Sequence, residues 1–291
     1  MKIKIGTRAS PLALAQTEII AREILKFFPE IEISIIKIKT SGDKNLAPFS
    51  SDPQGIKGMF TLELEHALLN HEIDFAVHSL KDLPANINEA LPIVAYSRRE
   101  DPRDALIIRS EELGVRSEKI LIGSSSLRRR LQLEKIFPEK KILPVRGNVN
   151  TRLKKLDDGE FDALVLAVAG LKRLGLENRI SKIFEVDEIL PAPGQGILAC
   201  QTRREENYFY LERINDENSK LCALAERAFS RVLNAGCNVP VGAFASINGK
   251  ILTLRGLYID EAEKKFYRGV LSGNLYDAES IGQELAKKLF N

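Results

Sequence analysis

Three consecutive arginines follow a run of serines in the stretch IGSSSLRRR, which begins at Ile122. If a helix starts after the serines, Arg128 and Arg129 lie in its first turn, where the helix macrodipole disfavours cations. The hydroxyls of Ser124 and Ser126 and the free backbone N–H groups of the helix would converge on the same place. The segment therefore predicts a binding site for an anion. The alternative is that the arginines are solvated or pair with neighbouring acids such as Glu134.

Two further basic clusters occupy the same kind of position, between a strand and a helix. Arg146 ends one strand pattern and is followed by Asn148 and Arg152, and Arg8 ends another strand pattern close to Ser10. Ligands of open α/β sheets bind beyond the carboxyl ends of the strands, so the three clusters could face one cleft. Arginine pairs bidentately with carboxylate or phosphate, which predicts a polyanionic ligand. No GxxxxGK[ST] motif is present, which argues against ATP.

A candidate catalytic carboxylate follows another strand pattern. The stretch FAVHSLKDLP places Lys81 and Asp82 directly before a proline turn. Nearby cations would keep Asp82 ionised, so it could stabilise a developing cation or transfer a proton. A surface ion pair between these two residues is the alternative interpretation.

The histidines do not predict a metal site. The spacing of His66, His71 and His78 matches no ligand pattern for a metal ion. We interpret His66 and His71 as residues on a helix surface and His78 as a strand residue.

The three cysteines stand in different contexts. Cys200 and Cys222 lie within apolar patterns that indicate core positions, whereas Cys237 lies in NAGCNVP, which is typical of a loop. A loop could present the thiolate of Cys237 as a nucleophile or as a point of covalent attachment. An odd number of cysteines argues against a disulfide framework.

Composition limits the classes of function. The 291 residues carry 43 basic and 40 acidic side chains, and a net charge of +3 makes a large nucleic-acid footprint unexpected. The longest apolar run, ALVLAVAGL, is far shorter than the roughly 20 residues of a membrane span. The first residues, MKIKIGTRAS, lack the apolar region of a secretory signal, so we expect a cytoplasmic protein.

Strand and helix patterns alternate along most of the chain, which predicts an α/β fold with mixed, mostly parallel sheets. The segment from Thr40 to Met59 is rich in Gly, Pro, Ser and Asp, and we expect a binding loop or lid there. Stretches beginning at Ser97 and Leu190 are punctuated by prolines or glycines and predict crossings between domains. Beyond Asn215 the pattern changes to a small α+β unit.

Taken together, the motifs resemble the hydroxymethylbilane synthase (porphobilinogen deaminase) family from Lys4 to roughly Ala245. They are, in order, GTRASPLALAQ, FAVHSLKDLP, REDPRDAL, GSSSLRRRLQ, VRGNVNTRLKKLDDGEFDALVLAVAGLKRLG, PAPGQGILA and AERAF…AGCNVPVGA. The most specific are the Arg-Gly-Asn and Gly-Cys-x-Val-Pro motifs. One departure is Ser124, where the family commonly has threonine, which preserves the hydroxyl.

The resemblance implies three domains. Domain 1 comprises residues 1–97 and 194–214, with a lid loop at 42–60; domain 2 comprises 98–193; and domain 3 comprises 215–291. The first two domains would resemble the halves of a periplasmic binding protein. The third would be a small α+β domain that carries the cysteine.

The resemblance also implies the chemistry. Such an enzyme condenses four porphobilinogen molecules head to tail, releases ammonia and yields the linear tetrapyrrole hydroxymethylbilane. A dipyrromethane cofactor on Cys237, held by a thioether, would prime the reaction, and Asp82 would be catalytic. The implied cofactor-binding residues are Lys81, Asp82, Ser124, Ser126, Arg128, Arg129, Arg146 and Asn148. The implied substrate-binding residues are Arg8, Ser10, Arg146, Arg152, Arg173 and Gln195, with Gln195 at the hinge and Lys57 in the lid.

Two other functions remain open at this point. A two-lobed binding protein for anionic solutes would use the same arginines without catalysis, and a phosphate- or nucleotide-using transferase would direct them at phosphate. We expect porphobilinogen as a small-molecule partner, no nucleic acid, no membrane and a monomer.

Overall fold

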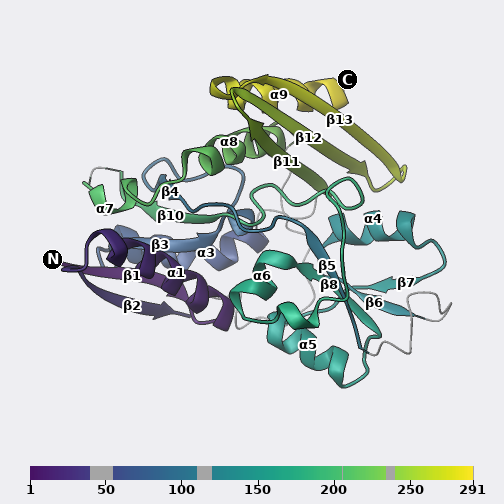
Figure 1. Cartoon of the computed structure of the whole chain (residues 1–291), viewed down its shortest axis with the longest axis horizontal. Helices are drawn as coiled ribbons and strands as arrows, with labels where there is room; N and C mark the ends of the chain where they lie inside the picture. Colours follow the sequence, from purple (N-terminus) through teal and green to yellow (C-terminus); the bar gives the residue numbers. More distant parts are fainter. Residues whose placement is uncertain (40–54, 110–119, 205, 234–239, 291) are drawn as a thin grey trace.

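The computed structural model describes residues 1–39, 55–109, 120–204, 206–233 and 240–290, with only the backbone described for 55–60. Its described strands form three sheets, which lie in separate parts of the molecule (Figure 1). The two five-stranded sheets lie side by side at the left and right of the view. The three-stranded sheet lies above them with the C-terminus.

The first sheet has the order β2-β1-β3-β10-β4. Strand β10 is antiparallel to both of its neighbours, and the other four strands run in one direction. Helices pack on the sheet, and its apolar core joins Ile24 of a helix to Ile5 and Phe75 of the strands. The elements are β1 (Lys2–Arg8), α1 (Pro11–Phe27), β2 (Glu32–Ile38), α3 (Gly55–Leu69), β3 (Phe75–Ser79), η1 (Leu80–Asp82), β4 (Ile93–Tyr96), β10 (Leu198–Thr202) and α7 (Phe209–Glu212).

The second sheet repeats this plan with the order β7-β6-β8-β5-β9. Strand β5 is the one that runs against the other four. Each sheet is therefore mixed and mostly parallel in strand direction, which confirms the predicted fold class. The elements are β5 (Asp104–Ile108), β6 (Leu121–Gly123), α4 (Leu127–Ile136), β7 (Lys141–Leu143), α5 (Val149–Asp157), β8 (Ala163–Ala167), α6 (Val168–Arg173), η3 (Glu177–Arg179) and β9 (Lys182–Ile183).

The third sheet is an antiparallel meander covered by two helices. Its core joins Phe229 of one helix to Leu285 of the other and to Leu254 of the central strand. The elements are α8 (Glu217–Val232), β11 (Val241–Asn248), β12 (Ile251–Asp260), β13 (Lys265–Asn274), η4 (Leu275–Asp277) and α9 (Ala278–Phe290).

Two segments cross between the five-stranded sheets and hydrogen-bond to each other. The N–H of Glu100 donates to the carbonyl of Gly196 at 3.1 Å. Gly196 has φ +93°, and a Cβ there would lie 2.3 Å from the carbonyl oxygen of Glu100. Only glycine combines this backbone conformation with so close an approach.

Helix α8 connects the crossing segments to the third sheet, and in Figure 1 it lies between that sheet and strand β10. Glu226 of α8 has a completely buried side chain that pairs with Arg99 at 2.6 Å. Its carboxylate also accepts the N–H of Gly194 at 2.7 Å and that of Ala245 at 2.7 Å. One carboxylate thus joins both crossing segments to strand β11.

The predicted elements agree closely with the structure, with two local differences. The predicted lid loop at 42–60 is helical at its end, because helix α3 begins at Gly55. His71 does not lie on the helix surface. It follows the end of α3 with φ +58°, in the turn that reverses the chain.

Replacing Glu226 by alanine should lower the free energy of unfolding by about 3–5 kcal/mol, because Arg99 would be left buried without its counter-ion. Urea unfolding followed by circular dichroism measures this change. The matched control is Glu279→Ala, which removes an exposed pair with Arg231 and should cost about 0–1 kcal/mol. Equal effects for the two variants would contradict the role given to Glu226.

Candidate active site

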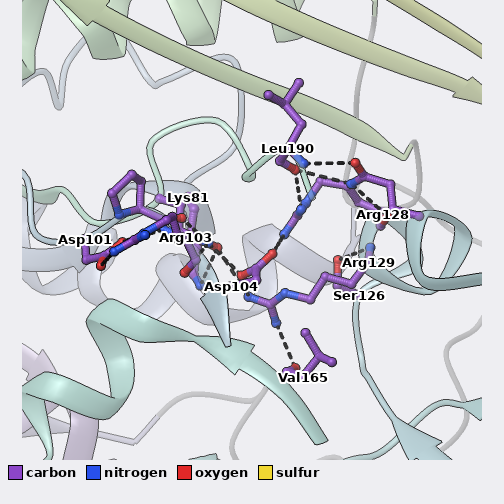
Figure 2. A network of polar contacts seen from close by, with 12 residues as sticks. Lys81, Asp101, Arg103, Asp104, Ser126, Arg128, Arg129, Val165 and Leu190 are labelled. Atoms are coloured by element: carbon purple, nitrogen blue, oxygen red, sulfur yellow. Dashed lines mark hydrogen bonds and ion pairs between the residues drawn. The ribbon is translucent and has the colours of Figure 1, made fainter. Parts of the chain in front are cut away.

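Asp104, the first residue of β5, holds the arginines of the SSSLRRR stretch. Its Oδ2 accepts from Nη2 of Arg128 at 2.9 Å, and its Oδ1 accepts from Nη2 of Arg129 at 2.7 Å (Figure 2). The carboxylate is fully buried, and the two arginine side chains are 5% and 7% exposed. Arg128 also donates to the carbonyl of Leu190, in the second crossing segment. The arginines are therefore neither solvated nor paired with Glu134.

Gln195 extends this cluster toward the first sheet. Its Nε2 donates to Oδ1 of Asp104 at 2.8 Å and to the carbonyl of Pro102 at 2.6 Å. Its Oε1 accepts from Nζ of Lys81 at 3.3 Å and from Nη2 of Arg129 at 3.3 Å. The buried amide thus joins Lys81, which follows β3 of the first sheet, to the arginines of the second.

The charges in this cluster shift two pKa values. Burial alone would raise the pKa of Asp104, but Arg129 and Arg128 outweigh it and hold the pKa well below its ordinary value. For Lys81, burial and the neighbouring Arg129 lower the pKa to about 8, against the opposing effect of Asp82 and Asp104. Lys81 is therefore a cation at neutral pH that loses its proton as the pH rises through about 8.

A cavity of about 60 Å³ lies at the same edge of the first sheet, where β1 and β3 end. It is lined by Arg8, Ser10 and Asp82, together with His78 and Gln16. The side chain of Ser10 caps α1 by accepting the N–H of Ala13 at 3.3 Å. The carboxylate-bearing residue Asp82 is exposed. Three residues proposed from two separate motifs thus line one pocket.

Arg152, in the first turn of α5, belongs to the second sheet but interacts with groups from both. Burial and the neighbouring Arg129 lower its pKa to about 10, and Asp82 opposes this shift, so Arg152 remains a cation at neutral pH. Its Nε donates to the carbonyl of Gly147 at 2.7 Å. Half-buried Arg146 precedes the same helix. Arg152 of the second sheet therefore lies close enough to Asp82 of the first sheet for their charges to interact.

Some predicted site residues also have structural partners within the chain. Asn148 caps α5, where its Oδ1 accepts the N–H of Thr151 at 2.9 Å, and Ser126 caps α4 by accepting the N–H of Arg129 at 3.4 Å. Arg173 donates to the carbonyl of Gly196 at 2.6 Å, in the crossing segment. Cys237 and the side chain of Lys57 lie outside the described residues.

The cluster fits the carboxylates of a dipyrromethane. Arg128 and Arg129 carry two positive charges against the single negative charge of Asp104, and Lys81 adds a third positive charge. The hydroxyl of Ser124 is buried beside them without a hydrogen-bond partner. A buried excess of cations with a spare donor is stabilised by a bound anion.

Sequence analysis missed two residues of this site. Asp104 stands directly before the apolar run ALII, and an acid at the start of a buried strand requires cationic partners. This requirement could have identified Asp104 from the sequence. His78 was assigned to a strand, which is correct, but its place in the cavity wall depends on packing. Burial lowers the pKa of His78 to about 4, so the imidazole is neutral.

Within the described residues there is no cluster of His, Cys, Asp and Glu that could hold a metal ion. Among the same residues, no helix combines the length and apolar character needed to span a bilayer. Cys200 and Cys222 are buried free thiols, as their apolar patterns predicted.

Comparison with known proteins identifies relatives over the whole chain. The family model described as porphobilinogen deaminase, dipyromethane cofactor binding domain, matches residues 3–210, and the model of the porphobilinogen deaminase C-terminal domain matches residues 220–291. A porphobilinogen deaminase of Ruminiclostridium josui is 50% identical over 99% of this chain and 97% of its own length. One from Nostoc sp. is 43% identical over 99% of this chain and 90% of its own.

Solved structures with related architecture are more distant. A TRAP periplasmic solute binding protein from Desulfovibrio salexigens is 11% identical, with a TM-score of 0.41 over 76% of this chain and 73% of its own. The periplasmic aliphatic sulphonate binding protein of Escherichia coli is 13% identical, with a TM-score of 0.40 over 80% and 70% of the two chains.

In protein without bound cofactor, the amine of Lys81 should titrate with a midpoint near pH 8, well below the ordinary lysine value of about 10.4. Nuclear magnetic resonance of protein with ¹³C-labelled lysine measures the midpoint, and the resonance that disappears in Lys81→Arg assigns the signal. An ordinary midpoint would show that Lys81 is not buried beside the arginines.

Proposed function

The chain belongs to the porphobilinogen deaminase family, and on this premise we propose which of its residues carry out the reaction. The family reaction is the condensation of four porphobilinogen molecules, with loss of ammonia, to hydroxymethylbilane, primed by a dipyrromethane cofactor. The observation that carries the assignment is that Asp82 lines a pocket with Arg8 and Ser10, while its charge also acts on Arg152 of the second sheet.

Substrate binding falls to the cavity at the end of β1 and β3. Each porphobilinogen ring carries an acetate and a propionate, and Arg8, Arg146 and Arg152 supply cations for these groups. The hydroxyl of Ser10 lies beside Arg8 in the cavity wall. A charge-assisted hydrogen bond contributes roughly 1.5–3 kcal/mol, so a few such contacts would hold the ring firmly.

Cofactor binding falls to the cluster around Asp104. Arg128, Arg129 and Lys81 supply the positive charge, and the buried hydroxyl of Ser124 supplies a donor. Cys237 would hold the cofactor, which would supply a pyrrole carbon for the first condensation. Asn148 and Ser126 serve this site indirectly, because their side chains fix the first turns of α5 and α4.

Asp82 is the proposed catalytic residue. Loss of ammonia from the substrate leaves a positive charge delocalised over its pyrrole ring and methylene carbon. The carboxylate of Asp82 accepts a hydrogen bond from the pyrrole N–H, and its negative charge stabilises the cation as it develops. Its exposure in the pocket that it lines with Arg8 leaves it accessible to each incoming ring.

We propose that the domain limits follow the sheets, with domain 1 at residues 1–97 and 194–214, domain 2 at 98–193 and domain 3 at 215–291. Arg173 and Gln195 act at the hinge, where both contact the crossing segments. The proposed protein is a cytoplasmic monomer. Its partner is porphobilinogen, and it binds neither nucleic acid nor membranes. Lys57 belongs to the proposed lid.

The direct test of this function is to incubate the purified protein with porphobilinogen, follow its consumption and detect the linear tetrapyrrole. A two-lobed solute-binding protein would bind porphobilinogen without consuming it. Intact mass spectrometry separates the two cases independently, because the enzyme carries the added mass of a dipyrrole and the binding protein is bare polypeptide.

Replacing Cys237 by serine should abolish cofactor retention, because a serine hydroxyl offers no thiolate for the thioether. Intact mass spectrometry should then give the bare polypeptide mass. The matched control is Cys222→Ser, which alters a buried thiol of α8 and should leave the dipyrrole mass in place. Full cofactor content in Cys237→Ser would overturn the attachment site.

Replacing Asp82 by asparagine should leave the cofactor bound and reduce kcat by about 100- to 1,000-fold, because the charge is lost while the size is kept. Steady-state consumption of porphobilinogen measures kcat, and intact mass spectrometry confirms that the cofactor is present. A normal kcat would exclude Asp82 as the stabiliser of the developing cation.

A further inference from the structure

Asp104 contacts two of the residues proposed to bind the cofactor, Arg128 and Arg129. It does not line the cavity at Asp82, and its side chain is fully buried. We propose that Asp104 is a positioning residue, which holds Arg128 and Arg129 in their binding geometry before any anion enters and transmits this order to Lys81 through Gln195. The inference deepens the proposed function and rests on it, because it concerns the same cofactor cluster.

The two arginines need such a residue because their helix does not favour them. Both occupy the first turn of α4, whose macrodipole is positive at that end. Without a counter-ion, their guanidinium groups would repel each other and move apart toward solvent. Asp104 offers one oxygen to each, at 2.9 and 2.7 Å, and the carbonyls of Leu190 and Val165 receive further donors (Figure 2).

The cluster keeps a surplus of positive charge despite Asp104. One carboxylate neutralises one of the two guanidinium groups, and each guanidinium has five N–H donors, of which only some are used. Asp104 therefore fixes the position of the arginines without cancelling the attraction for an anion. A site built in this way loses little conformational entropy when its ligand binds.

Gln195 connects the fixed arginines to Lys81, which follows β3 of the first sheet. Because Nε2 of Gln195 donates to Oδ1 of Asp104, its Oε1 must face the opposite way, where Lys81 and Arg129 donate to it. Asparagine at position 104 would weaken this constraint, since a neutral amide oxygen is a poorer acceptor and its amide is a donor. Lys81 would then lose both a fixed partner and a nearby negative charge.

The experiment compares Asp104→Asn with the parent protein and with Asp162→Asn. Asp162 pairs with Arg109 at 3.2 Å in the same sheet, away from the cluster. Three quantities are measured: the fraction of chains carrying the dipyrrole mass, the kcat and KM for porphobilinogen, and the titration midpoint of Lys81. A parent protein without activity would contradict the proposed function itself, and in an active parent the variants test Asp104.

For Asp104→Asn we expect a smaller loaded fraction and a kcat/KM lower by about 100-fold, the cost of misplacing a binding group. The Lys81 midpoint should fall below about 8, because Asp104 opposes the effects of burial, Arg129 and Arg128 on that pKa while Asp82 remains. The lower midpoint shows that the charge of Asp104 acts at Lys81. The smaller loaded fraction and the lower kcat/KM of a folded variant show that the arginines need Asp104 in order to bind. Asp162→Asn should match the parent in all three quantities.

An Asp104→Asn variant with parental loading, kcat/KM and Lys81 midpoint would overturn the proposal. If that variant does not fold, side-chain resonances of Arg128 and Arg129 in Cys237→Ser provide the test. Ordered, slowly exchanging guanidinium signals in this cofactor-free protein support positioning by Asp104. Averaged signals from mobile guanidinium groups would exclude it.

Discussion

The site depends on a buried excess of positive charge, which the protein's own acidic side chains neutralise only in part. Asp104 supplies a single negative charge to Arg128 and Arg129, and Lys81 adds a cation on the other side of Gln195. Burying charges without full compensation is costly in a folded protein. This cost is recovered when an acidic ligand enters, so stability given up in the empty site reappears as binding affinity.

The architecture places this surplus where the two five-stranded sheets meet. Strand ends and helix starts of both sheets supply the cations, and the crossing segments supply Gln195 and the close contact at Gly196. The Arg99–Glu226 pair attaches these segments to the third sheet. The site therefore rests on a junction of all three sheets, and its backbone connections are made by buried polar contacts as well as by apolar packing.

Local patterns in the sequence were sufficient to predict most helices and strands and the polar residues at their ends. Ser10, Ser126 and Asn148 cap helices where a polar residue precedes a helical pattern, because capping is a local interaction. The partners of Arg128 and Arg129 could not be assigned in this way, since Asp104 is distant in sequence and joins them only through the order of strands. The insertion of β10 between β3 and β4 could not be predicted either, because β10 is distant from both strands in the sequence. The roles of the site residues and the domain limits stay predictions.

Helix α8 links the third sheet to the loop that follows Asp82. It ends shortly before Cys237 in the sequence, and its Arg227 donates to the carbonyls of Pro84 and Ala85, just beyond Asp82. Through Arg227, helix α8 is therefore fixed to the loop that follows Asp82. A shift of the third sheet against the first would move the carboxylate that we propose to be catalytic.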